Sequence, residues 1–341
     1  MTRAPWLVGL SLLASCSTTP VVTTQPPASA SATTPSSSAP AIRPVGDAPV
    51  LEGNDVGGKT AVLPGALVII DGTYHAFLVG FGQQPGDQRV FYGTSEDGMT
   101  WSLDEADPLE GIGLELDLNP PGPIPTSVLI ETDGSWTMYL WGVTDPSGFR
   151  ASIWRATATT PEGPWVVDPE PVLRGDADAW DSLGVDFASV VRTADGYLMV
   201  YVGASMADRN TPHIGMATST DGITWSKQED PVLSPGHCGD FDDRAVTQPR
   251  LIGTEEGFLL AYSGNGLDEP DAALGLSTSA DGLTWSCAST SPLLERADVP
   301  GSEGIHTFAL ADWSGAPQVL VESLIEGGSE LWLGELVGIA P

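Results

Sequence analysis

The sequence predicts an all-β fold: a five-bladed β-propeller that follows a disordered tether and is closed by an N-terminal strand. Five copies of a strand–turn–strand unit recur about every sixty residues, the mark of a repeat architecture. Gly and Pro number 40 and 29, which favours turns over long helices. A Pro-hydrophobic segment that ends each repeat also occurs once before the first copy, at residues 49–52.

Residues 1–15 have the pattern of a signal peptide. Arg3 precedes an apolar stretch over 6–13 that is too short to cross a bilayer. The segment 13–16 reads LASC and resembles the lipobox of bacterial lipoproteins, which implies cleavage before Cys16 and lipidation of its thiol. An ordinary secretory signal is the alternative. We expect an exported protein, held to the cell membrane or outer membrane only by lipid and facing outside the cytoplasm.

Residues 16–46 are predicted to be a flexible tether. From Ser17 to Ile42 the chain carries no charge and is almost wholly Ser, Thr, Pro and Ala. Such a segment cannot bury enough apolar surface to offset the entropy lost on ordering. The folded domain is therefore expected over 47–341.

The charge balance excludes several partners. Asp and Glu number 45 against 13 Lys and Arg, a formal net charge of −32. This excludes a nucleic-acid binder that neutralises phosphates with a basic face, and it argues against adsorption of the folded surface to anionic lipid. Charged residues make up only 17% and hydrophobic residues 41%, a globular composition. We expect a monomer.

Each repeat begins with two apolar strands joined by a tight turn. A Gly follows Asp, Glu or Ser in this turn, and Gly permits the positive φ that tight hairpins require. The five copies span 66–81, 126–143, 188–204, 249–265 and 308–324.

A third strand and a second turn follow in four of the copies. Asp97, Asp221 and Asp281 precede Gly in this turn, in a motif that resembles the Asp box of sialidases with one residue fewer between Asp and Gly. The motif is interpreted as a structural staple. A Trp recurs just after it and is expected to fill the space between neighbouring blades, at positions 101, 165, 225 and 285.

The fourth strand begins with Pro and hydrophobic residues, as in 171–173 and 231–233. The last unit has no such segment after 329–337, whereas 49–52 supplies one at the other end of the domain. We therefore predict that 49–52 completes the last blade and covers its exposed edge. A pair of β-sandwiches is the alternative, but it leaves the displaced segment unexplained.

Cys238 and Cys287 remain once Cys16 is lipidated. An even pair in an exported protein predicts one disulfide. A metal site is the weaker alternative, because no ligand spacing accompanies the two cysteines.

Five such blades resemble the propellers of glycoside hydrolase family 43 and its relatives in families 32, 68, 117 and 130. The resemblance covers 47–341 and rests on the segments WDSLGVDFASVV, DGYLMVYVG, ATSTDGITW and PVLSPG. It implies an oligo- or polysaccharide bound at one mouth of the axis, where the innermost strands begin. In these families an Asp acts as base, another Asp tunes pKa values and a Glu is the acid, since hydrolysis needs two carboxylates.

Aligning the repeats shows no acid at the position of the family's base. The five residues there are Gly65, Pro125, Phe187, Gln248 and Thr307. The preceding position holds Asp186 in blade 3 and His306 in blade 5, so Asp186 alone carries over, as a base or pKa-tuning carboxylate. This departure favours the alternative of a non-catalytic propeller that binds glycan or a surface protein. A third alternative is a structural propeller whose acidic surface serves solubility.

Polar residues are concentrated in the loops that lead to the axis. We predict Asp186 and Glu303 as base and acid, with His306 tuning the acid. The predicted substrate-binding residues are Asp243, Arg244, Gln248 and Trp180. Asp181 and Asp242 recur in register and are interpreted as caps of the turns that enter each blade.

One acidic segment lies before blade 2. Glu115, Asp117 and Asn119 are candidates for a calcium site or for a further wall of the mouth, although their spacing matches no known calcium loop. No other cofactor or metal is expected.

Overall fold

The computed structural model describes residues 39–82, 87–103, 109–112, 119–143, 150–267, 271–311 and 317–339. The predicted signal peptide, Cys16 and the tether up to residue 38 lie outside these residues, as do Glu115 and Asp117. Within the described part of the chain, no helix is both long enough and apolar enough to span a membrane.

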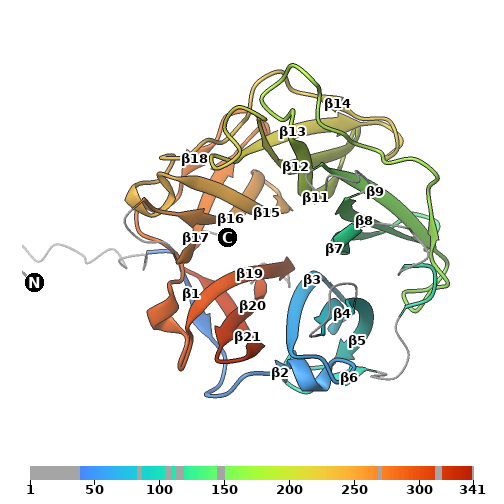
Figure 1. Cartoon of the computed structure of the whole chain (residues 1–341), viewed down its shortest axis with the longest axis vertical. Coiled ribbons are helices and arrows are strands. Elements are labelled where there is room, and N and C mark those ends of the chain that lie inside the picture. Colours follow the sequence, from blue (N-terminus) through green and yellow to red (C-terminus); the bar gives the residue numbers. More distant parts are fainter. Residues whose placement is uncertain are drawn as a thin grey trace, which may run out of the picture. The chain divides into compact units, whose positions relative to one another are not determined.

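Five antiparallel sheets surround a central axis and form a five-bladed β-propeller (Figure 1). Blade 1 comprises β3 (Ala61–Ile70), β4 (Thr73–Phe81), β5 (Arg89–Ser95) and β6 (Ser102–Leu103). Blade 2 comprises β7 (Asn119–Ile130), β8 (Trp136–Val143), β9 (Ala151–Ala158) and β10 (Val166–Val167). Blade 3 comprises β11 (Gly184–Thr193), β12 (Gly196–Ala204), β13 (His213–Ser219) and β14 (Ser226–Lys227).

Blade 4 comprises β15 (Ala245–Thr254), β16 (Gly257–Asn265), β17 (Ala272–Ser279) and β18 (Ser286–Cys287). Blade 5 comprises β19 (Gly304–Ala311), β20 (Gln318–Ile325) and β21 (Gly328–Val337), with β1 (Ala41–Pro44) and β2 (Leu51–Glu52) from the other end of the domain. The described residues also form short 3₁₀ turns at η1 (Gly53–Asp55), η3 (Asp240–Asp242) and η4 (Arg296–Asp298). The all-β, five-bladed prediction is confirmed.

The segment at 49–52 pairs with the last blade and closes the ring, as predicted from its displaced position. Leu51 pairs with Leu331 and Glu52 with Glu330 on β21. The structure adds β1, which pairs with the C-terminal half of β21. Since β1 lies inside the range predicted to be tether, ordered structure begins earlier than residue 47.

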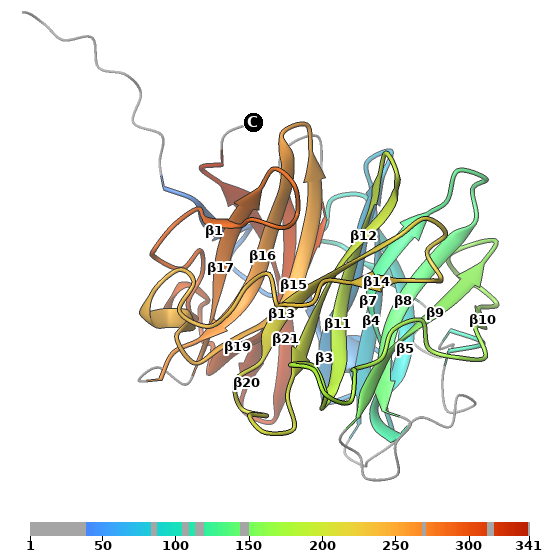
Figure 2. The same ribbon diagram turned by 90° about the horizontal axis from the view of Figure 1, so that it is seen from above.

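The first complete strand of each blade lies nearest the axis (Figure 1). These innermost strands are β3, β7, β11, β15 and β19. The view turned by 90° shows β11 and β15 running along that axis (Figure 2). The ends at which these strands begin therefore face one mouth of the ring.

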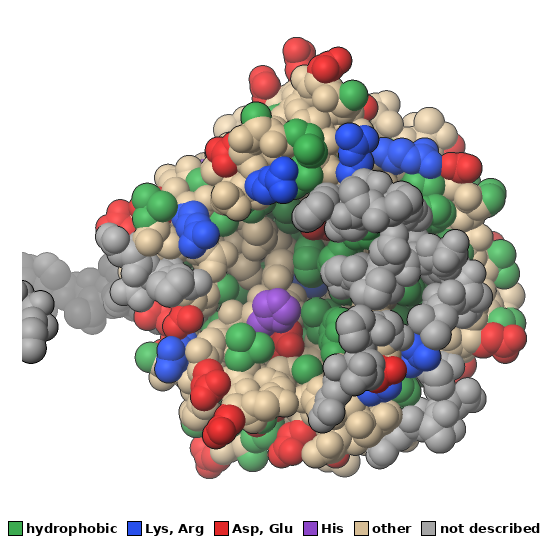
Figure 3. Space-filling view, in the orientation of Figure 1, with side chains coloured by type: hydrophobic (Ala, Val, Ile, Leu, Met, Phe, Trp, Pro, Cys, Tyr) green, Lys and Arg blue, Asp and Glu red, His purple; other side chains and the backbone are tan. Residues whose placement is uncertain are grey.

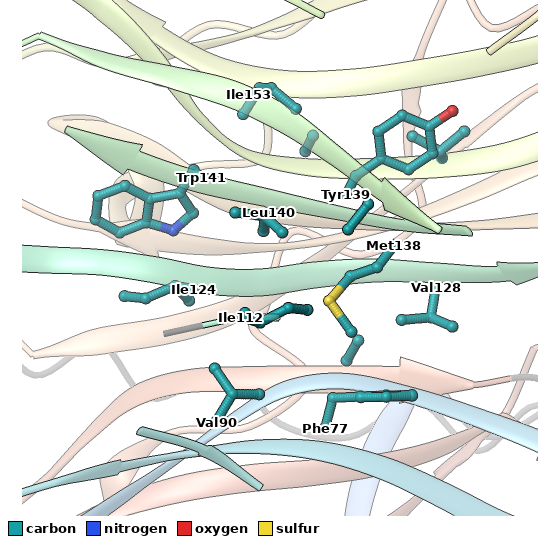
Figure 4. Packing of buried hydrophobic residues seen from close by; sticks show 14 of the residues in the cluster. Phe77, Val90, Ile112, Ile124, Val128, Met138, Tyr139, Leu140, Trp141 and Ile153 are labelled. Carbon is teal, nitrogen blue, oxygen red and sulfur yellow. The ribbon is translucent and has the colours of Figure 1, made fainter. Parts of the chain in front are cut away.

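The hydrophobic core lies between neighbouring blades. Phe77 and Val90 of blade 1 lie beneath Ile124 and Met138 of blade 2, with Ile112 of the connecting segment between them (Figure 4). Further clusters join blades 3 and 4, 4 and 5, and 5 and 1. Apolar residues on both faces of each sheet are thus buried, which is why β8 is buried along its whole length.

The recurring Asp and Trp residues have the predicted structural roles. Asp221 Oδ1 accepts hydrogen bonds from the N–H groups of Ile223 and Thr224, at 2.8 and 2.7 Å. Asp97 and Asp281 repeat this geometry. Trp225 meets Tyr139 of the preceding blade edge-on, with ring centroids 5.9 Å apart.

The predicted disulfide is present. It joins Cys238 to Cys287, with Cα atoms 5.4 Å apart. Cys238 lies in the loop that enters blade 4 and Cys287 lies on β18, so the bond links the start of the blade to its outer strand.

Candidate functional site

A β-bulge interrupts the innermost strands of blades 3, 4 and 5 near the mouth where these strands begin. In each case two residues lie opposite a single residue of the next strand. The pairs are Phe187-Ala188 opposite Tyr201, Gln248-Pro249 opposite Tyr262 and His306-Thr307 opposite Glu322. A bulge redirects side chains, and bulges are common beside active sites.

Two residues at these bulges have a left-handed backbone. Phe187 has φ 44° and Gln248 has φ 50°. Such values are rare outside Gly and persist only where the surrounding structure holds them. Gln248 is buried and its Oε1 accepts a hydrogen bond from Ser263 Oγ at 3.3 Å, which helps to hold this conformation.

The bulges correct the alignment of blade 5. By the strand register, His306 corresponds to Phe187 and Gln248, and Ile305 corresponds to Asp186. The sequence alignment instead placed Thr307 with Phe187 and His306 with Asp186. The reason is that the bulge begins three residues after Gly184 in blade 3 but two residues after Gly304 in blade 5, so an alignment that matches the starts of the two strands is shifted by one residue at the bulge.

Asp186 lies in a cavity of about 300 Å³ at this mouth. Phe187, Thr247 and Gln248 line the same cavity. Asp186 Oδ1 is buried and accepts no hydrogen bond from the described residues. Burial raises the pKa of Asp186 to about 7, because removal from water disfavours the charged form. A carboxylic acid in this state is able to donate a proton near neutral pH.

The other two predicted catalytic residues lie elsewhere. Glu303 is exposed, just before β19, and the described lining of the Asp186 cavity includes neither Glu303 nor His306. His306 Nδ1 lies 2.8 Å from Glu322 Oε2, and this hydrogen bond to a carboxylate raises the pKa of His306. Figure 3 shows the centre of one face hollowed, with a histidine side chain beside the hollow.

Of the four predicted substrate-binding residues, only Gln248 lines the cavity. Trp180 stacks on Tyr201, with ring centroids 5.8 Å apart, and packs over Gly203, where a Cβ atom would lie 2.6 Å from its ring. Asp243 and Arg244 are exposed, and Asp243 Oδ1 accepts a hydrogen bond from the Leu267 N–H at 2.8 Å. The structure therefore places Trp180 in the packing of blade 3.

The two recurring aspartates have the capping role expected of them. Asp181 Oδ1 accepts a hydrogen bond from the Asp176 N–H at 3.0 Å, and Asp242 Oδ2 accepts one from the Cys238 N–H at 3.0 Å. Each carboxylate also accepts a hydrogen bond from the hydroxyl of a buried Tyr on the second strand of its blade. Both are structural residues.

Three charged residues escape sequence reasoning. Arg209 lines the Asp186 cavity, Glu322 is buried on β20, and Arg250 is buried on β15. The sequence does carry a signal for Glu322 and Arg250: each is the single charged residue of its strand, as in QVLVESLI for Glu322. No group of three or more His, Cys, Asp or Glu side chains suited to a metal occurs among the described residues.

No protein-family model matches this chain, and no curated protein matches it. Solved structures do. A glycosyl hydrolase from Bacteroides ovatus matches with a TM-score of 0.63 and 17% identity, covering 82% of this chain and 85% of the other. A family 117 glycoside hydrolase of the marine bacterium Zobellia galactanivorans matches with a TM-score of 0.60 and 16% identity, covering 89% and 92%.

A third match is to a structure from family 130, described as mannoside phosphorylases containing glycoside hydrolases that target β-1,2-mannosidic linkages in Candida mannan. Its TM-score is 0.64 at 18% identity, with 86% and 92% of the two chains covered. The fold is that of the glycoside hydrolase propellers. At this level of identity the likeness concerns the fold and leaves the chemistry to the residues themselves.

Proposed function

We propose that this propeller binds an oligo- or polysaccharide at the cavity around Asp186 and cleaves a glycosidic bond there. The observation that carries the proposal is a buried carboxyl group with a pKa raised to about 7, in a cavity of about 300 Å³ at the mouth of the axis. Such a cavity is at the lower end of the size range of ligand pockets. The glycoside hydrolases that share the fold support the substrate class.

The raised pKa of Asp186 supports the role of acid for this residue. A protonated carboxyl is able to protonate the leaving oxygen of a glycosidic bond, whereas a base has to be ionised. Glu303 lies outside the described lining of the cavity but directly before β19, at the end where the innermost strands begin, and it is the partner carboxylate in this proposal, acting as the base that activates water. These roles reverse those expected from the sequence, because burial favours the neutral form of Asp186.

The test is turnover on a panel of oligo- and polysaccharides. Asp186→Asn and Glu303→Gln are each expected to lower kcat by about 100-fold or more, the usual contribution of a general acid or base. Asp243→Asn is the matched control, since this exposed Asp lies outside the cavity. Full activity of Asp186→Asn or of Glu303→Gln, at a normal melting temperature, would exclude the substituted residue from the mechanism.

One observation favours a second candidate, a propeller that binds glycan without cleaving it. The residues at the bulges of blades 3, 4 and 5 are Phe187, Gln248 and His306, and none has a carboxylate. This candidate predicts saturable glycan binding by calorimetry with no release of reducing ends. It also predicts that Phe187→Ala weakens binding. Hydrolysis by the wild type that is lost in Asp186→Asn would rule out this second candidate.

We also propose that Cys16 is lipidated and holds the domain at the outside of a membrane. The support is the LASC segment after a short apolar stretch. Cells fed a radiolabelled fatty acid should label the protein, and Cys16→Ser should abolish the label and release the protein from the membrane fraction. A labelled Cys16→Ser variant would contradict the proposal.

A further inference from the structure

Arg250 is buried at the axis without an opposite charge. It follows the bulge of β15 and is only 3% exposed. Its guanidinium donates to the backbone oxygens of Pro249, at 3.1 Å, and Gly65 across the ring, at 3.4 Å, whereas its Nε is buried with no hydrogen-bond partner in the described structure. The guanidinium carbon lies 5.6 and 6.0 Å from the ring centroids of Phe308 and Phe187.

A second cavity, of about 270 Å³, extends along the axis from Arg250. The innermost strands of all five blades line it, and Arg250 is the single charged residue in its described lining. The lining hydroxyls already have partners in neighbouring blades: Thr126 Oγ1 donates to the Ala188 oxygen at 2.7 Å, and Ser189 Oγ accepts from the Leu251 N–H at 2.9 Å. Arg250 is thus the group in this cavity whose charge is left uncompensated.

An unpaired buried charge is strongly unfavourable, because backbone oxygens and aromatic rings replace only part of the lost hydration. Burial lowers the pKa of Arg250 to about 9, which still leaves the guanidinium mostly charged at neutral pH. No ion pair of Arg250 with an Asp or Glu occurs within the described ranges. Within the described part of the chain nothing balances this charge, which leaves the site open to a neutralising group from outside the chain.

We propose that the axial cavity binds one small monovalent anion, a halide or a formate-sized carboxylate, against the guanidinium of Arg250. The cavity has room for such an ion with several waters, since a water occupies about 30 Å³. The fork of guanidinium N–H donors suits a carboxylate or a halide. The net charge of −32 opposes entry of an anion only weakly, because salt screens charges beyond about 8 Å at physiological ionic strength.

The test is thermal unfolding of the protein at constant ionic strength, with sodium gluconate replaced stepwise by sodium chloride, bromide or formate. Gluconate carries five hydroxyls that would lose their hydration in this cavity, where the lining hydroxyls already have partners, and it keeps the screening unchanged. The wild type should gain about 2–4 °C in Tm at an anion concentration about ten times Kd, and above Kd the gain should grow with the logarithm of the anion concentration. Arg250→Met should show no gain. Arg192→Met is the matched control, because it removes an Arg that is paired with Glu131 and is not part of the cavity's described lining, and it should respond like the wild type.

Crystals of the wild type grown in bromide provide an independent measurement. An anomalous peak is expected in the axial cavity within hydrogen-bonding distance of the Arg250 guanidinium. Since Arg250→Met also removes a buried charge, it is expected to fold and to be at least as stable as the anion-free wild type. If it does not fold, the bromide map decides. A cavity without a bromide peak, or an equal anion response in Arg250→Met, overturns the proposal.

Discussion

At the scale of single residues, Asp186 makes the stability of the protein depend on pH. Its pKa is raised to about 7 in the folded state, against about 3.9 in an unfolded chain. The folded state therefore holds the proton more tightly, so the stability associated with this group is complete below pH 4 and is lost as pH rises to about 7.

Asp186→Asn should remove this dependence. The free energy of unfolding of the variant relative to the wild type should rise between pH 4 and 7, by up to about 4 kcal/mol, because one pKa unit corresponds to 1.36 kcal/mol. Urea denaturation at a series of pH values measures it. The comparison with the wild type cancels the other titrating groups, and a difference that stays constant with pH would show that Asp186 is ionised normally.

The His306–Glu322 pair has a pH dependence of its own. Glu322 is buried and favours protonated His306, whose pKa is raised. This contribution is complete below the unfolded pKa of His, about 6.5, and is lost as pH rises through the folded value. His306→Gln should therefore destabilise the protein more at pH 6 than at pH 9, by less than about 1 kcal/mol because the imidazole is largely exposed. NMR titration of the His306 ring is the direct measurement, and an unshifted pKa would contradict the pairing.

Sequence reasoning predicted Asp186 as a site residue, and the structure places it in a cavity, but the same reasoning missed Arg250 and Glu322. Asp186 stands out because its position in the repeat holds no acid in the neighbouring blades. The environment of Arg250 depends on residues far away in the chain, such as Gly65, which lies 185 positions earlier. No local pattern reports such a contact.

At the scale of elements, β1 seals the last blade. Ile42 is buried between blades 4 and 5, and its N–H donates to the Leu293 oxygen at 2.8 Å. Ile42→Asp should destabilise the domain by about 3–5 kcal/mol, since it buries an unpaired charge. Arg43→Asp, at the next and exposed position, is the control and should change the free energy of unfolding little. Equal effects of the two substitutions in urea denaturation would show that β1 is not docked.

The strands themselves were predictable and the bulges were not. Apolar pairs around Gly turns recur five times, and the segment at 49–52 is conspicuous because it is out of order. A bulge adds one residue to one strand and shifts the alternation of side chains beyond it, but in blades that are buried on both faces the sequence shows little alternation to begin with. In blade 5 the bulge begins one residue nearer the start of its strand than in blade 3, so the position of His306 came only from the strand register.

At the scale of the whole molecule, the acidic surface sets the response to salt. A formal charge of −32 makes the compact state repel itself. The Tm should therefore rise as sodium gluconate increases from about 0.01 M to about 1 M, over which the Debye length falls from about 30 to about 3 Å. Scanning calorimetry measures the shift. A Tm that falls or stays flat would mean that the acidic residues are offset locally by pairs within the fold.

The closure of the ring has a consequence for how the protein comes to be made. The edge strands β1 and β2 are synthesised first among the described strands, yet their partner β21 spans Gly328–Val337, at the other end of the domain. In a nascent chain these two strands therefore lack their partner until β21, at Gly328–Val337, emerges, and contacts between such distant segments form slowly. Closure of the ring is then a late event in folding. A truncation before Gly328 removes β21 and leaves β1 and β2 without the strand they pair with.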